Sequence, residues 1–273
     1  MNSRTVHWDP MLFLKEEPTP SCLMRVKRDI ADFKADPLPG IFISPEESDL
    51  TQVHALVVGP EGTPYEGGFF HFFMKFPSNY PVSPPRVRIM TTDAGRVRFN
   101  PNLYANGKVC LSILGTWDGP PWSPAQCIGS VLVSIQSLLN EDPFYNEPGT
   151  RPGMMSDMAR RYKERVQHDA VRVAICDAVQ GCLKDEPPMP RDLAETVLKT
   201  FAESYDKYEQ LLRSLIEQSK QKTTTWTQCL ERIIMPATPT IQYEPLLTRL
   251  QELHKRVKER AEAQAAAQAG GQD

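Results

Sequence analysis

One cysteine set between turn-forming residues is the feature of this 273-residue chain best suited to chemistry. Cys110 lies in residues 98–122, which read RFNPNLYANGKVCLSILGTWDGPPW. Asn106-Gly107, a dipeptide that readily makes a tight turn with positive φ, comes shortly before it. Further turn residues follow it, so the thiol is predicted to lie at the mouth of a loop. A thiol with a pKa of ~8.5 is a few per cent thiolate near neutral pH, which suffices for exchange between thioesters without a dedicated base.

Two other interpretations of Cys110 start from the residues themselves. Free cysteine is among the most buried residue types, so Cys110 taken alone is also typical of a small core residue. A cysteine hydrolase is the other alternative, and its mechanism requires a histidine beside the thiol. Residues 98–122 contain no histidine. His54 and His71 fall inside predicted strands, where each is interpreted as a structural residue.

Composition and cysteine spacing exclude several classes of protein. The formal charge of −3 indicates neither nucleic acid nor an anionic membrane as a partner. The six cysteines have no CxxC spacing, so the sequence predicts no metal site, no cofactor and no disulfide framework. A reducing compartment, the cytosol or the nucleus, is therefore expected. The apolar patch at residues 11–14 is too short for a signal sequence or a membrane span, and residues 1–18 are typical of a tether or of the cut edge of a longer protein.

Four short segments rich in β-branched and aromatic residues are separated by glycine- and proline-containing turns. Connections of this length predict an antiparallel meander. The predicted strands are residues 41–44, 52–58, 69–76 and 86–90.

Helical periodicity predicts helices on both sides of this sheet segment. The pattern Ser123-Pro124-Ala125-Gln126 resembles a capping box with proline at the first helical position, so a buried helix is predicted to start there. A turn is predicted at residues 236–239. The other predicted helices are residues 22–35, 154–183, 193–217 and 243–267.

The motifs around Cys110 resemble the active-site segment of ubiquitin-conjugating enzymes. That segment usually reads His-Pro-Asn, then Asn-Gly, then Cys-Leu, and here the three parts are residues 100–102, 106–107 and 110–111. Asn100 stands where the family has histidine, so the bracing hydrogen bonds of that histidine are expected to be absent. The resemblance covers roughly residues 19–183, because flanking motifs occur in the family's order at residues 65–70, 76–85 and 122–125.

The resemblance implies an α+β fold: the ubiquitin-conjugating fold with its four-stranded antiparallel meander flanked by helices. The insert at residues 115–119 and the segment at residues 146–149 most resemble extended enzymes of the family, such as the Z-type with its long C-terminal extension. The expected organisation is a tether over residues 1–18, a catalytic core over 19–183 and a helical extension over 184–273 that packs on the core.

The resemblance also implies an activity and roles for three residues. Such enzymes accept ubiquitin or a ubiquitin-like protein as a thioester on the cysteine, here Cys110, and pass it to a lysine or to another cysteine. Asn102 is expected to stabilise the oxyanion of the amide-forming step, with a turn-stabilising role as the alternative. Glu147, just before a proline, is expected to gate the site, with a plain loop carboxylate as the alternative. A pseudo-enzyme that binds ubiquitin without reacting is the rival outside catalysis.

Partners follow from the same resemblance. In the family the first helix docks on the activating enzyme, which is the enzyme that consumes ATP. Here that helix carries Arg25 and Lys27, which are expected to contact the activating enzyme. The alternative is that they belong to a solvated helix face. The Z-type resemblance implies charging by the noncanonical ubiquitin-activating enzyme, which also handles a tandem ubiquitin-like modifier. The surface that binds ligases is expected at Pro81 and Val82 and at Ser123 and Pro124.

Overall fold

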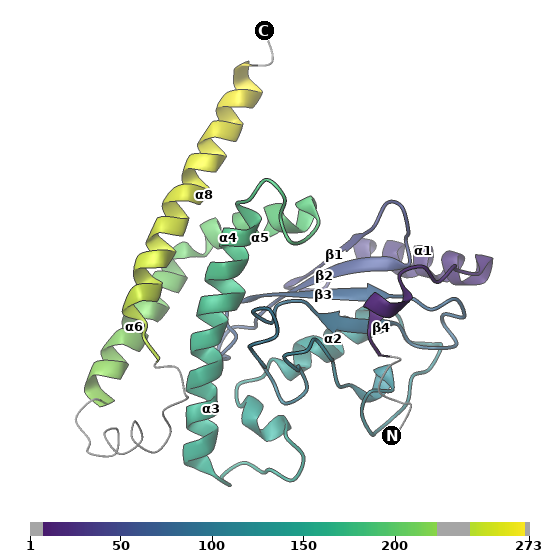
Figure 1. The fold of residues 1–273 in the computed structure, drawn as a ribbon, viewed down its shortest axis with the longest axis horizontal. Coiled ribbons are helices and arrows are strands. Elements are labelled where there is room, and N and C mark those ends of the chain that lie inside the picture. Colours follow the sequence, from purple (N-terminus) through teal and green to yellow (C-terminus); the bar gives the residue numbers. More distant parts are fainter. Residues whose placement is uncertain (1–7, 223–240, 271–273) are drawn as a thin grey trace.

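The computed structural model describes residues 8–222 and 241–270. Its sheet is an antiparallel meander in the order β1-β2-β3-β4, as predicted (Figure 1). Alternate residues of each strand face opposite sides of a sheet, and Val57 of β2 pairs with Phe70 of β3 in the register that places both in the core. The strands are β1 (Ile41–Pro45), β2 (Gln52–Val58), β3 (Phe69–Lys75) and β4 (Arg86–Ile89).

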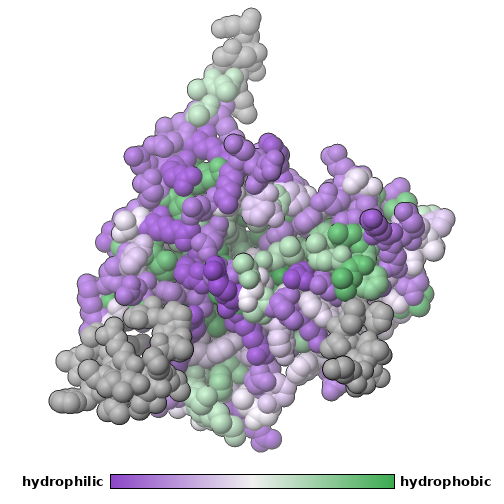
Figure 2. Space-filling view, in the orientation of Figure 1, coloured by the Kyte–Doolittle hydropathy of each residue, from purple (hydrophilic) through white to green (hydrophobic). Residues whose placement is uncertain are grey.

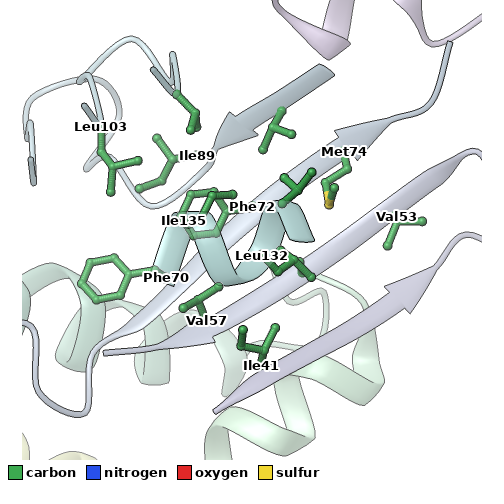
Figure 3. Packing of buried hydrophobic residues seen from close by; sticks show 14 of the residues in the cluster. Ile41, Val53, Val57, Phe70, Phe72, Met74, Ile89, Leu103, Leu132 and Ile135 are labelled. Carbon is green, nitrogen blue, oxygen red and sulfur yellow. The ribbon is translucent and has the colours of Figure 1, made fainter. Parts of the chain in front are cut away.

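Helix α2 (Ile128–Leu138) covers one face of the sheet, with Leu132 and Ile135 over the apolar side chains of the strands (Figure 3). The predicted start of this helix at Pro124 is wrong. Ser123 to Gln126 form a separate turn, in which Gln126 N–H donates to the Ser123 carbonyl at 2.9 Å. Cys127 then caps the helix, and its N–H donates to Ser130 Oγ at 3.2 Å. Helix α1 (Pro20–Ala35), capped by Thr19, packs beside α2.

The long helix predicted over residues 154–183 is present, but its middle is a π-helix. It consists of α3 (Ser156–Asp169), the π-helical η5 (Ala170–Asp177) and α4 (Ala178–Cys182). The π segment lies between two hydrophobic clusters: Val173 joins the cluster under α2, whereas Ile175 joins a second cluster shared with the C-terminal helices. The π-helical segment therefore has apolar packing partners on both of its sides.

The first of the three described C-terminal helices lies against the side of the sheet opposite α2, and the other two pack on it (Figure 1). The three are α5 (Arg191–Glu203), α6 (Tyr205–Lys222) and α8 (Glu244–Gly270). The single helix predicted over residues 193–217 is wrong, because the chain breaks at Ser204 into α5 and α6. Leu56 and Phe69 of the sheet share the second cluster with Phe201 of α5.

A glycine with positive φ accommodates α6 on the core. The Tyr208 hydroxyl donates to the Gly67 carbonyl at 3.0 Å, and a Cβ at Gly67 would lie 2.3 Å from the Tyr208 ring. The division into tether, core and extension stays a prediction. The turn predicted at residues 236–239, and Cys229, lie outside the described residues.

The 3-10 helix η2 (Pro10–Phe13) crosses the sheet near β4 (Figure 1). Asp9 pairs with Arg88, and the Arg86 guanidinium lies 3.7 Å from the centre of the Phe13 ring. Figure 2 shows a mostly hydrophilic face with scattered hydrophobic areas. Within the described ranges, no helix is both long and apolar enough to cross a membrane.

Candidate active site

Cys110 ends the return arm of a small hairpin whose tip is Asn106-Gly107. Gly107 has φ +95°, which confirms the predicted turn. Across the hairpin, Tyr104 N–H donates to the Lys108 carbonyl at 3.0 Å, and Cys110 N–H donates to the Asn102 carbonyl at 2.9 Å. The thiol is therefore fixed opposite Asn102 by main-chain pairing.

Thr116 fixes the chain on the other side of Cys110, a role that the sequence did not reveal. Its hydroxyl donates to the Val109 carbonyl at 2.6 Å and accepts from Leu111 N–H at 3.0 Å. The residues on both sides of Cys110 in the chain are thus hydrogen-bonded to the same Thr116 hydroxyl. The only signal in the sequence was the turn at residues 115–117, which predicts a loop but not which side chain closes it.

The Cys110 residue is 1% exposed, so the prediction of a thiol at the mouth of a loop is wrong for this state. Burial raises the pKa of the Cys110 thiol, while the nearby cations of Lys108 and Arg98 act to lower it. In this structure Cys110 is covered by its neighbours.

The rate at which iodoacetamide alkylates Cys110 is expected to keep rising at pH values where the alkylation rate of an exposed cysteine has already reached its plateau. Burial favours the neutral thiol, so the thiolate forms at higher pH than the ordinary ~8.5. Lys108→Met should move the midpoint further up, because one cation that lowers the pKa is lost. Mass spectrometry resolved by cysteine gives the pH profile; a midpoint for Cys110 below that of glutathione would refute the assignment of its environment.

Asn102 is 8% exposed, and its side-chain amide donates to the Cys110 carbonyl at 2.9 Å. In this state the amide braces the loop. The acceptor is the backbone carbonyl of the nucleophile itself, so the Asn102 amide lies beside Cys110.

Asn100 supplies the brace that its replacement of histidine was expected to remove, so that expectation is wrong. Its amide donates to Tyr65 Oη at 3.0 Å and to the Leu138 carbonyl at 2.8 Å, and its oxygen accepts from Asn102 N–H at 3.0 Å. Asn146 also donates to Asn100 Oδ1, at 3.3 Å. An asparagine offers both donors and an acceptor, so it joins the loop to the end of α2.

Glu147 is exposed and forms an ion pair with Arg98, with Oε2 3.6 Å from Nη2. Arg98 also donates through Nε to the Asn100 carbonyl at 3.2 Å, and its guanidinium stacks 4.2 Å from the centre of the Tyr104 ring. Because the charge of Arg98 acts to lower the pKa of the Cys110 thiol, the Arg98–Glu147 pair is part of the surroundings of the thiol.

The candidate ligase-binding residues lie together. Trp122 donates through its indole N–H to the Pro81 carbonyl at 2.8 Å, which places Pro81 and Val82 beside Ser123 and Pro124. Val82 is 71% exposed. The structure brings two segments that are forty residues apart onto one surface, where they stay candidates for partner binding.

The two candidate residues of α1 differ in their surroundings. Arg25 pairs with Asp29 at 2.7 Å and donates to the carbonyls of Pro124 at 2.9 Å and Gln126 at 2.6 Å. Lys27 is exposed. Arg25 therefore joins α1 to the turn before α2, whereas Lys27 is free to meet a partner.

The histidines of the sheet are engaged with each other. His54 Nδ1 lies 2.8 Å from His71 Nε2, and His54 Nε2 lies 3.0 Å from Glu46 Oε1. The charged groups that act on the Cys110 thiol are a lysine and an arginine, not a histidine. The described part of the chain contains no group of three metal-ligating side chains.

Comparison with known proteins gives a consistent result. The family model described as "Ubiquitin-conjugating enzyme" matches residues 25–175. The human protein named ubiquitin-conjugating enzyme E2 Z is 51% identical over 206 residues, which cover 74% of this chain and 57% of that protein. Its Xenopus tropicalis counterpart is 43% identical over 256 residues, 93% of this chain and 78% of that protein.

A third relative is much larger. The human protein named dual E2 ubiquitin-conjugating enzyme/E3 ubiquitin-protein ligase BIRC6 is 42% identical over 159 residues, 53% of this chain but 3% of its own length. The chain also spans little more than half of the human E2 Z that it matches.

Proposed function

Because the chain belongs to the ubiquitin-conjugating enzyme family, we propose that it accepts ubiquitin or a ubiquitin-like protein from an activating enzyme as a thioester on Cys110. It then transfers the modifier to a lysine or to a ligase. The observation that carries the proposal is the position of Cys110, held between the Asn102 pairing and the Thr116 hydroxyl in a segment of the family's form.

In the loading step, the Cys110 thiolate attacks the carbonyl carbon of the modifier's thioester on the activating enzyme. A new C–S bond forms, the old one breaks, and the activating enzyme leaves as a thiolate. The two thioesters are of similar energy, so no dedicated base is needed.

Transfer to lysine is harder, because an amine with a pKa of ~10.4 is about one part in a thousand neutral at pH 7.4. The neutral amine attacks the thioester, negative charge develops on the acyl oxygen, and the C–S bond to Cys110 then breaks. A donor such as the Asn102 amide stabilises that oxygen. The Glu147 carboxylate, at the rim, is suited to hold the incoming ammonium and take its proton.

The proposal is tested by incubating the protein with activating enzyme, ATP and ubiquitin and running the products without reductant. An adduct that reductant removes supports transfer. No adduct would identify a binding scaffold, and turnover of a ubiquitin thioester to free ubiquitin without acceptor would identify a hydrolase. We propose the noncanonical ubiquitin-activating enzyme as the partner on the basis of the similarity to E2 Z. Parallel reactions with this enzyme and with the common activating enzyme test that choice.

Lys27→Glu is expected to slow loading several-fold at low salt and less at high salt. Lys27 is an exposed cation on α1, and exposed charges steer association and are screened over a Debye length of ~8 Å at physiological ionic strength. Discharge of already loaded protein to free lysine should be unchanged. Single-turnover loading at two salt concentrations is the measurement, and equal slowing of loading and discharge would exclude α1 as the docking surface.

Arg25→Glu is the matched control for folding. It removes the bonds of Arg25 to Asp29 and to the turn before α2, so it should lower the melting temperature as well as the loading rate.

A further inference from the structure

We propose that Tyr162 is a positioning residue for the transfer to lysine: its hydroxyl donates to the Glu147 carboxylate when an incoming lysine opens the ion pair between Glu147 and Arg98. This inference rests on the proposed function and adds a residue to it. Tyr162 belongs to α3, outside all the motifs around Cys110.

The first observation is that the ion pair of Glu147 is loose and crosses between two segments. Arg98 precedes the hairpin that carries Cys110, whereas Glu147 ends the 3-10 helix η4 (Pro143–Asn146). Their closest atoms are 3.6 Å apart, and the side chains are 41% and 52% exposed. Such an exposed pair contributes little to stability, so a lysine ammonium can compete with Arg98 for the carboxylate.

Arg98 stays in place when the pair opens. Its guanidinium also donates to the carbonyls of Asn100 and Pro101 and stacks on Tyr104. Glu147 is therefore the mobile partner of the pair, and a second contact is needed to hold its carboxylate once the lysine arrives.

The second observation is the Tyr162 hydroxyl, which is buried without a hydrogen-bond partner among the described residues. A buried polar group without a partner is rare and needs an explanation. Burial raises the pKa of Tyr162 to about 12, so the hydroxyl remains a donor at neutral pH.

The charges of both Arg98 and Glu147 act on this hydroxyl, with opposite effects on its pKa. The ring packs on Phe144 of η4, with centroids 6.0 Å apart, which holds Tyr162 at the base of the segment that carries Glu147. A buried donor on which both charges act, and which is held against the segment that carries the anion, is placed to donate to the carboxylate once its pair with Arg98 opens.

Tyr162→Phe tests the inference directly, because it removes only a hydroxyl that has no hydrogen-bond partner in the described part of the resting protein. We expect unchanged loading, an unchanged or slightly higher melting temperature, and discharge to free lysine slowed about tenfold, the low end for loss of a hydrogen bond to a charged group. Discharge to hydroxylamine should stay at the wild-type rate, because this nucleophile is already uncharged at neutral pH and brings no ammonium for Glu147 to hold and deprotonate before attack.

Tyr145→Phe is the matched control. Tyr145 lies in η4 close to Glu147, and its hydroxyl donates outward to the Met154 carbonyl at 3.3 Å. This variant should discharge to lysine like the wild type. In a Glu147→Gln background, Tyr162→Phe should have no further effect, because a neutral amide neither holds an ammonium nor takes its proton, so its position no longer sets the rate.

Three outcomes would overturn the inference. Tyr162→Phe could discharge to lysine at the wild-type rate, or it could slow discharge to lysine and to hydroxylamine equally. The third is that the rate effects of Tyr162→Phe and Glu147→Gln multiply in the double variant. Failure of the proposed function is distinguishable, since the wild-type protein itself would then form no adduct.

Discussion

Cys110→Ser is expected to turn the reducible adduct into one that withstands reductant. The serine hydroxyl occupies the same place between Asn102 and Thr116 and accepts the acyl group as an oxyester, which thiols do not readily exchange. Loading should also slow by orders of magnitude, because a hydroxyl is far less ionised than a thiol at neutral pH. A gel run with and without reductant measures both effects.

Cys127→Ser is the matched control. Of the five described cysteines, Cys127 alone is not buried, so it is the strongest competitor of Cys110 for the modifier. It caps α2, and serine is a favoured N-cap residue, so the substitution should preserve stability. Normal loading by this variant is expected. A reducible adduct on Cys110→Ser at the wild-type rate would refute Cys110 as the acceptor.

Asn102→Ala is expected to slow discharge to lysine by about 10²–10³, the usual cost of losing one oxyanion donor. Loading should be largely spared, because the activating enzyme supplies its own surroundings for that step. The melting temperature should fall slightly, since the bond from the amide to the Cys110 carbonyl is lost and such a bond contributes about 1 kcal/mol. Single-turnover loading, single-turnover discharge and melting on one preparation provide the three readouts.

The network of Asn100 makes this test sharper. Because Asn100 joins the loop to Tyr65 and to the end of α2, the loop keeps most of its bracing without the Asn102 side chain. A parallel fall in loading, discharge and stability would mean that Asn102 acts only as a brace.

Much of the fold follows from patterns that are local in the sequence. Short segments rich in β-branched and aromatic residues between turns define the meander, and Gly107 has the positive φ that its tight turn requires. The position of Cys110 in the site follows from the motif around it. Its burial does not, because that depends on how the neighbouring loops close over the thiol.

The features that the sequence does not predict depend on contacts between residues far apart in the chain. Ser123 to Gln126 have the composition of a helix start, yet Arg25, about a hundred residues earlier, binds the carbonyls of that turn. The π-helix at residues 170–177 depends on two clusters that meet only in the folded chain. The brace at Asn100 cannot be predicted from the role of a histidine, because an asparagine carries its own donors and acceptor and finds partners in Tyr65 and at the end of α2.

The attachment site of the modifier is measured most directly by loading the wild-type protein, quenching at low pH, digesting it and locating the ubiquitin remnant by mass spectrometry. The expected result is a remnant on the peptide that contains Cys110, absent after treatment with reductant. A remnant on the Cys127 peptide, or on a lysine with none on Cys110, would contradict a thioester on Cys110.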